Sequence, residues 1–368
     1  MIIVLLIISI YLYIISKTTN SKNILFAIPL IVIIITVVRQ IKNLDTMLPD
    51  YQNYWWAFER AISGNANYRY EIGYKTISQF FGYFGIGFPI FNEFLLIASF
   101  LILCISVVKF NGNIVAFLLL YFGSVFFIDI IQTRNTVAMT LILFFLSFQV
   151  KYGKSTYLWV IVAVLLSTLF QNIGIFFLIL LPFIPKNMNK NKDKRVFKTI
   201  RVITNMVIFG FFLMVAVFPS ILRNILLKMT MVVPNSYLES LLQATSVSTP
   251  FIMIVAIISI MMALYGHYVE TIYGFQLKYN QLLLVQILKV QIYALPLLFV
   301  ISDFQRAIRI GLVAMIMLHA ILISNEKYRH NRALNLLMYS CYLLGSYELV
   351  WKLIFKSVMI SFYQYWIN

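Results

Sequence analysis

The sequence has few of the residues from which metal sites, disulfides and phosphate-binding loops are built. Its 368 residues include only two cysteines and three histidines. Cys104 and Cys341 lie in apolar stretches and the histidines are scattered, a pattern that predicts neither a disulfide nor a metal centre. A Walker-type glycine-rich phosphate loop does not occur in the sequence either. We therefore expect no cofactor and no metal.

Charged residues are also scarce, at 11% of the chain, whereas 62% of the residues are hydrophobic. The apolar residues form runs of about 20, the length at which a helix crosses the roughly 30 Å core of a bilayer. A membrane β-barrel would instead show alternating segments of about 10 residues. The sequence therefore predicts an all-α, polytopic integral membrane protein, a single membrane domain over residues 1–368. It would contain about 12 transmembrane helices, within a range of roughly 10 to 14.

The 29 basic residues outnumber the 12 acidic residues, which gives a formal net charge of +17. Most of the basic residues lie in short segments between apolar runs, where lysine and arginine mark the cytoplasmic side. This placement explains the charge without a nucleic-acid partner. It predicts cytoplasmic basic loops at 185–201 and 324–332, and external loops at 39–88 and 220–249.

Because basic segments mark the cytoplasmic side, they also fix the direction in which each apolar run crosses the membrane. Residues 155–184 form either one broken span or two short passes, and the basic segments on both sides favour two. This predicts a hairpin that turns outside at Gln171 and Asn172. The other spans are predicted at 2–16, 23–38, 89–108, 113–128, 131–150, 202–219, 250–267, 282–301 and 333–350, with one more that starts around 302–311.

Polar and charged residues gather at three places on the predicted outer side of the membrane. A charge inside a membrane span costs roughly 2.5–3.5 kcal/mol on insertion scales, so a residue kept there usually faces a cavity, a partner or a substrate. For Arg134, the alternative is that its side chain snorkels to the interface. The three groups are Asp129, Gln132, Arg134 and Asn135; Gln171 and Asn172; and Asp303, Arg306 and Arg309.

The predicted external loop 39–88 is rich in aromatic residues and carries both signs of charge. Trp55, Trp56 and Phe58 are typical of an interfacial belt near the lipid headgroups, and the alternative is that they stack on sugar rings. Asp50 and Glu71 in the same loop are ordinary loop acids unless a family pattern assigns them a role.

Three stretches resemble the EpsG/Wzy-type polysaccharide polymerases of bacteria. They read DYQNYWWAFE…YEIGY between Asp50 and Tyr74, IIQTRNTVAMTLILFFLSF around the predicted span 131–150, and DFQRAIRIG from Asp303. Many relatives have a histidine in a small polar turn where this chain has Phe170, Gln171 and Asn172. A glutamine can position a substrate but cannot take a proton. If the histidine of the relatives acts as a base, this chain has no equivalent base at the turn.

The resemblance implies that repeat units linked to polyprenyl diphosphate are polymerised into capsular polysaccharide, exopolysaccharide or O-antigen. The reaction would take place at the outer face of the bacterial cytoplasmic membrane, on a multi-pass, GT-C-like and metal-independent glycosyltransferase. Undecaprenyl diphosphate would be the carrier, and membrane lipid would surround the protein. Flippase and chain-length regulator proteins would be its partners. Catalysis would fall to Arg134, Arg306, Arg309, Asp303, Glu71 and Asp50, and substrate binding to Gln132, Gln171, Asn172, Asp129, Tyr54 and Tyr74.

The chemistry of a diphosphate leaving group suits these residue types. The planar fork of an arginine binds phosphate oxygens through two parallel hydrogen bonds. The acceptor hydroxyl needs a base or an orienting carboxylate, for which Asp50, Glu71, Asp129 and Asp303 are the candidates. Two other functions stay open. A lipid-linked glycan ligase would differ only in its acceptor, and a flippase or exporter would usually show an internal repeat, which is not found in this sequence.

Overall fold

The computed structural model describes residues 49–64, 70–149, 153–184, 249–298, 304–323 and 326–348, with isolated positions between 206 and 224. Within these ranges the regular structure is helical and no strand occurs. The predicted spans at 2–16 and 23–38 and the predicted loops 185–201 and 220–249 fall almost entirely outside them. The helical membrane class is therefore confirmed, whereas the total of about 12 spans and the GT-C-like architecture stay predictions.

The helices of the first half are α3 (Pro49–Ile62), α4 (Ile72–Tyr83), α5 (Phe88–Lys109), α6 (Ile114–Phe122), α7 (Phe126–Ile131), α8 (Thr133–Ser147), α9 (Lys154–Thr168) and the 3₁₀ helix η3 (Asn172–Phe183). Those of the second half are α13 (Thr249–Tyr273), α14 (Tyr279–Val290), η4 (Gln291–Ala294), α15 (Leu295–Leu298), α16 (Gln305–Leu322), α17 (Glu326–Arg329) and α18 (Arg332–Ser346).

Local sequence explains where several helices begin and end. Pro89 lies in the first turn of α5, where its missing N–H has no helical partner to lose. After α5, Asn111 adopts a φ of 60°, a left-handed conformation that asparagine tolerates better than most residues. Asn113 then caps α6 by accepting hydrogen bonds from the backbone N–H groups of Val115 and Ala116.

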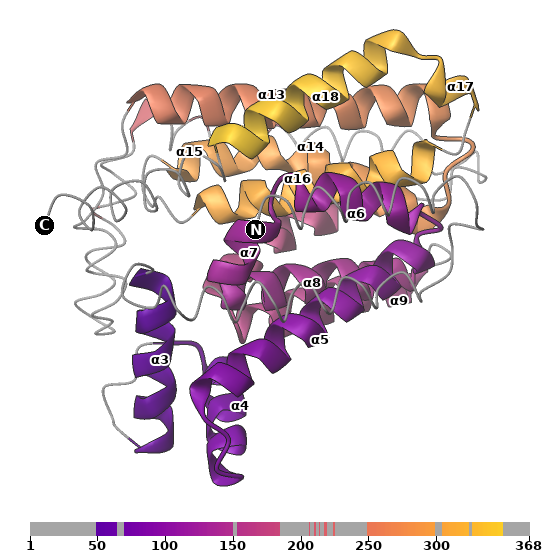
Figure 1. Ribbon diagram of the computed structural model, residues 1–368. Helices are drawn as coiled ribbons and strands as arrows, with labels where there is room; N and C mark the ends of the chain where they lie inside the picture. Colours follow the sequence, from indigo (N-terminus) through magenta and orange to yellow (C-terminus); the bar gives the residue numbers. More distant parts are fainter. Residues whose placement is uncertain are drawn as a thin grey trace, which may run out of the picture.

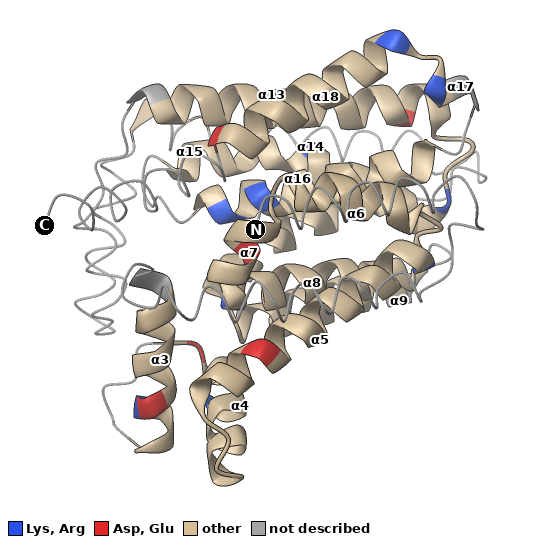
Figure 2. Cartoon of the chain, viewed as in Figure 1, with Lys and Arg blue, Asp and Glu red and all other residues tan. Residues whose placement is uncertain are grey.

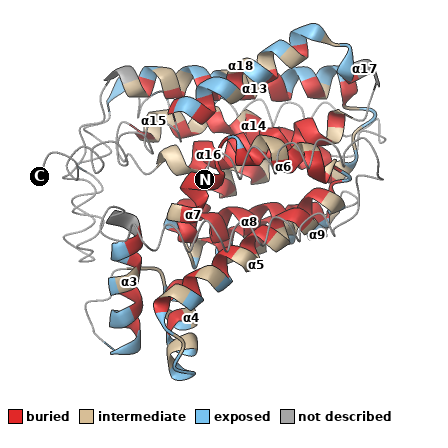
Figure 3. Ribbon diagram, viewed as in Figure 1, coloured by how far each residue is buried: buried red, intermediate tan, exposed pale blue. Residues whose placement is uncertain are grey.

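The long helices stack in layers, with α13 and α18 on one side, α14 and α16 in the middle, and α8, α9 and α5 on the other side (Figure 1). Helix α16 is the most enclosed of the four long spans, and its residues are buried from Ala307 to Ala320 (Figure 3). Helices α3 and α4 project from one end of the bundle (Figure 1). They form their own apolar cluster with the start of α5, centred on Phe58, Phe88 and Phe91.

Four of the described helices are long and apolar enough to cross a membrane, namely Phe88–Lys109, Phe251–Tyr273, Tyr279–Leu298 and Gln305–Leu322. Three shorter apolar helices, Thr133–Ser147, Ser155–Thr168 and Asn172–Phe183, pack beside them. The predicted hairpin over 155–184 has the expected break, because α9 ends at Thr168 and η3 begins at Asn172.

Other boundaries differ from the sequence prediction. The segment 39–88, expected as a loop, contains α3 and α4, and the predicted span 113–128 is divided into α6 and α7. The predicted span 250–267 continues to Tyr273 as α13, past the histidine at which it was expected to end. The polar and charged residues in α3 and at the end of α13 lower the hydropathy of these parts without preventing helix formation.

At the end of the bundle away from α3 and α4, amide side chains join three helix termini. Asn280 Nδ2 donates to the backbone oxygens of Lys109, at 3.3 Å, and Ser147, at 3.0 Å. Gln281 Nε2 donates to the backbone oxygen of Phe110 at 2.7 Å. These carbonyls lie at the C-terminal ends of α5 and α8, where backbone oxygens have no hydrogen-bond partner within their own helix. The start of α14 thereby fixes the relative positions of α5 and α8.

Candidate functional site

The candidate site is organised around the break between α7 and α8 at Gln132, whose φ of −103° and ψ of 57° are not helical. Two hydroxyl groups stabilise this break. Thr133 Oγ1 donates to Asn92 Oδ1 of α5 at 2.8 Å, and Thr136 Oγ1 donates to the backbone oxygen of Asp129 at 2.6 Å. The chain is therefore held where it turns from one helix into the next, and the Gln132 side chain is directed toward α16.

Arg309 of α16 meets this break from the other half of the sequence. Its guanidinium donates to Gln132 Oε1, and the residue is only 1% exposed. Arg306 lies one turn earlier on α16 and is partly exposed. Phe304, the N-cap residue of α16, gives that helix no side-chain cap, and its ring lies edge to face with that of Phe176 in η3, with 5.9 Å between centroids. The start of α16 thus lies beside the break and η3 and carries two arginines, of which Arg309 contacts Gln132.

Asp129 lies on the α7 side of the break and is 1% exposed. Its carboxylate accepts a hydrogen bond of 2.5 Å from the Tyr121 hydroxyl and lies within electrostatic range of Arg309. Figure 2 shows the acidic position of α7 next to the basic positions at the start of α16. The carboxylate that the sequence placed near Arg134 is therefore directed toward α6 and α16.

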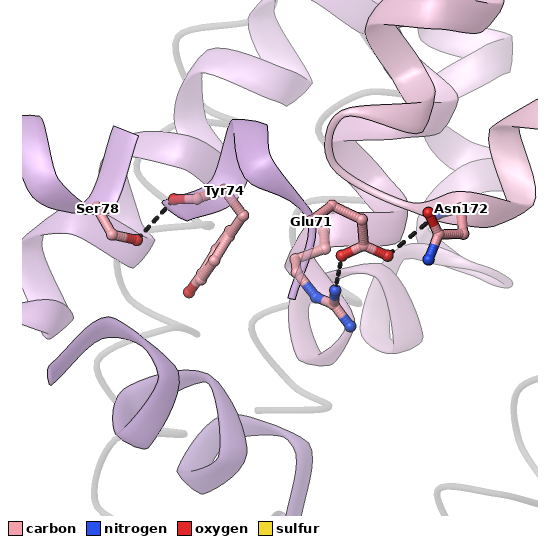
Figure 4. A network of polar contacts seen from close by, with 5 residues as sticks. Glu71, Tyr74, Ser78 and Asn172 are labelled. Atoms are coloured by element: carbon pink, nitrogen blue, oxygen red, sulfur yellow. Dashed lines mark hydrogen bonds and ion pairs between the residues drawn. The ribbon is translucent and has the colours of Figure 1, made fainter. Parts of the chain in front are cut away.

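Arg134 belongs to a second group, which contains residues from four segments. Its guanidinium forms an ion pair with Glu71 and lies over the ring of Tyr70, 3.8 Å from the centroid, and faces the ring of Tyr54 at 5.3 Å. The other oxygen of Glu71 accepts the backbone N–H of Asn172 at 3.1 Å (Figure 4). Removal of one partner from a buried ion pair costs about 3–5 kcal/mol, because the remaining charge has no counter-ion.

Several buried amides and hydroxyls near these groups have no hydrogen-bond partner among the described residues. Neither Oδ1 nor Nδ2 of Asn135 has such a partner, although the residue is only 1% exposed. Gln171 Oε1 is also buried and unpartnered, and so is Thr140 Oγ1, which lies farther along α8 from the break. An unpaired buried polar group costs about 1–3 kcal/mol, so such groups commonly mark the place of a ligand or an ordered water.

The predicted site residues fall into separate places. Gln132, Asp129 and Arg309 are joined at the break, and Arg134, Glu71 and Asn172 form the second group. Tyr54 and Tyr74 are buried in the aromatic cluster of α3 and α4, where Tyr54 faces Arg134 and the ring of Tyr74 lies 5.5 Å from that of Phe91. Asp303 lies outside the described residues, and so does the side chain of Asp50, whose backbone belongs to α3.

The sequence did not single out Tyr70, Tyr121 or Asn92, which contact the predicted residues directly. For Tyr70 the signal was present, because it immediately precedes Glu71 in the YEIGY stretch. Tyr121 and Asn92 lie within apolar helices, and nothing in the spacing of the sequence connects them with Asp129 or Thr133. Within the described part of the chain, no group of three or more His, Cys, Asp and Glu residues lies close enough to hold a metal ion.

Comparison with known proteins identifies one family. The model of the EpsG family matches residues 44–366, which is most of the chain and includes both arginine groups. No curated protein and no solved structure matches the chain.

Proposed function

The chain belongs to the EpsG family, and from this membership we propose that it polymerises oligosaccharide repeat units carried on polyprenyl diphosphate. The product is a capsular polysaccharide or exopolysaccharide, made at the outer face of the bacterial cytoplasmic membrane, and undecaprenyl diphosphate is the carrier. The full chain crosses the membrane about 12 times in a GT-C-like architecture. A flippase supplies the substrate, and a chain-length regulator acts on the product.

One observation carries this proposal: a buried arginine of α16 is held beside the break between α7 and α8. Arg309 is fixed by Gln132, and Arg306 lies one turn nearer the start of the same helix and is partly exposed. A helix N-terminus favours negative charge, because its first N–H groups have no partner within the helix and its dipole is positive there. Two arginines and a helix N-terminus together suit a diphosphate.

The diphosphate is the leaving group when a growing glycan moves from its carrier to the acceptor hydroxyl. Negative charge increases on the diphosphate as the glycosidic bond breaks, so fixed cations stabilise the transition state more than the bound substrate. Arg306 and Arg309 would supply this charge without a metal ion. Arg134, which the sequence assigned to the same role, is already paired with Glu71.

The acceptor hydroxyl must lose its proton to a base. Of the four carboxylates proposed for that role, Glu71 is bound by Arg134 and by a backbone N–H, and Asp129 is bound by Tyr121. Asp50 and Asp303 remain, and Asp303 precedes Arg306 by only three residues. From this spacing in the sequence alone, we propose Asp303 as the base.

The test compares Arg306→Lys and Arg309→Lys with Arg332→Lys, a matched change at an exposed position at the start of α18. Lysine keeps the charge but loses the two-pronged contact. Protein abundance, polymer and lipid-linked repeats are measured in cells that lack the native copy. We expect normal abundance of all three variants, normal polymer from Arg332→Lys, and accumulation of lipid-linked single repeats in the other two. Normal polymer from both Arg306→Lys and Arg309→Lys would contradict the assignment, and repeats retained on the inner leaflet would indicate a flippase.

A further inference from the structure

Both carboxylate oxygens of Glu71 are engaged in the structure. Oε2 takes part in the ion pair with Arg134, and Oε1 accepts the backbone N–H of Asn172 at the start of η3 (Figure 4). The Glu71 side chain is only 7% exposed and that of Arg134 only 4%. A proton acceptor needs an oxygen that can reach its substrate, and Glu71 would have to break one of these contacts to provide it.

The contacts around Arg134 come from one structural unit, the hairpin formed by α3, α4 and the residues between them. Tyr54 lies in α3, Tyr70 lies just before α4, and Glu71 is the N-cap residue of α4. Arg134 itself belongs to α8 of the bundle. The guanidinium therefore joins the hairpin to the bundle through one ion pair and two aromatic faces.

A backbone contact lies directly beside this ion pair. The N–H of Gly73 donates to the backbone oxygen of Leu169 at 2.8 Å, in the turn between α9 and η3. A Cβ at position 73 would lie 2.6 Å from that oxygen and 2.8 Å from the Cβ of Leu169. Only glycine permits so close an approach, so residues 71 and 73 of one helix end are fixed to the same turn.

We propose that Glu71 is a positioning residue whose carboxylate holds the hairpin of α3 and α4 on the membrane bundle, and that it is not the proton acceptor of the reaction. Arg134 lies two residues after Gln132, the residue that holds Arg309. Loss of the Glu71 contacts would therefore release the hairpin and disturb the arginine that binds the diphosphate.

Release of the hairpin is measured with a cysteine introduced in place of Val137, one turn after Arg134 on α8. Val137 is 8% exposed and packs within the apolar cluster that the hairpin forms with α5. The native residues Cys104 and Cys341 are both buried, so the background reaction with a polar maleimide is low. Labelling is performed in opened membranes, where the reagent reaches both faces and the assumed orientation of the chain does not matter.

The variants are Glu71→Gln, Arg134→Met and the two changes together, each with Val137→Cys. Each single change leaves a buried charge without its counter-ion, whereas the double variant is neutral. In the double variant we expect the glutamine to accept the N–H of Asn172 and the methionine to pack on the Tyr70 ring. We expect each single change to raise labelling of the introduced cysteine by roughly tenfold or more and to reduce polymer, and the double variant to restore protection and part of the polymer.

The matched control is Glu59→Gln, which removes a carboxylate from an exposed position of α3 and should change neither labelling nor polymer. The labelling result does not depend on the proposed polymerase function, on which only the polymer measurement rests.

Three outcomes would overturn the proposal: Glu71→Gln abolishes polymer while the introduced cysteine stays protected; the double variant is as inactive as Glu71→Gln; or the introduced cysteine reacts while polymer is normal. If the single variants do not accumulate, accumulation of a protected double variant supports the proposal and scarcity of all three contradicts it.

Discussion

Gln132 has two roles that depend on different parts of the residue. Its backbone leaves the helical conformation between α7 and α8, and its side-chain oxygen accepts a hydrogen bond from Arg309. A regular helix through residues 126–147 would continue the backbone pairing and direct this side chain elsewhere. The break therefore creates the contact between the two halves of the sequence.

Asn135, three residues after Gln132, tests whether the buried amides near the break serve a substrate. Its amide is 1% exposed and has no partner among the described residues, which costs about 1–3 kcal/mol unless a ligand pairs with it. We expect Asn135→Leu to unfold at the same or a higher temperature than the native chain and to make less polymer. The measurements are the unfolding midpoint of the purified protein and the polymer formed per unit of protein.

Thr140→Val is the matched control for Asn135→Leu, because Thr140 Oγ1 is also buried and unpartnered within the described structure. It lies eight residues, or about 12 Å along a helix, beyond Gln132. We expect its polymer yield to be unchanged. A fully active Asn135→Leu variant would show that the Asn135 amide does not contact substrate.

At the scale of helices, the close contact of α4 with the turn between α9 and η3 depends on Gly73. We expect Gly73→Ala to lower the free energy of unfolding by about 1–3 kcal/mol, because the new methyl group would overlap the backbone of Leu169. Gly87→Ala is the control, since its Cβ would meet nothing closer than 3.8 Å. Thermal unfolding in detergent measures both variants, and equal stability of the two would show that α4 does not pack as closely as described.

The sequence predicted helices well where apolar residues run without interruption, and less well elsewhere. The span 89–108 corresponds to α5, and the hairpin over 155–184 breaks at the expected polar turn. Helices α3 and α4 were missed because residues such as Glu59, Arg60 and Lys75 are interspersed among their aromatic residues. Their stability comes from tertiary packing against α5, which a pattern in one segment does not reveal.

The site was predictable as a set of residue types but not as a set of contacts. The polar residues at 129–135, 171–172 and 306–309 stood out because they interrupt apolar runs. The pairing of Glu71 with Arg134, and of Gln132 with Arg309, joins positions far apart in the sequence, and these positions are brought together only by the packing of the helices.

For the molecule as a whole, the described contacts separate two groups of helix ends. The breaks at 132 and 171 meet the start of α16 and the hairpin of α3 and α4, whereas the ends of α5 and α8 meet the start of α14. These are the ends that the charge pattern assigned to opposite faces of the membrane. Which group faces the outside stays a prediction from the positions of the basic loops.

We propose that this one chain forms glycosidic bonds between lipid-linked repeats without a metal ion. The purified protein would be reconstituted in vesicles with its lipid-linked repeat unit as the only substrate, in the presence of a chelator. We predict that polymer appears and that each new glycosidic bond releases one molecule of polyprenyl diphosphate. Movement of the repeat across the bilayer without any bond formation, or a requirement for added divalent metal, would contradict the proposed metal-independent polymerase.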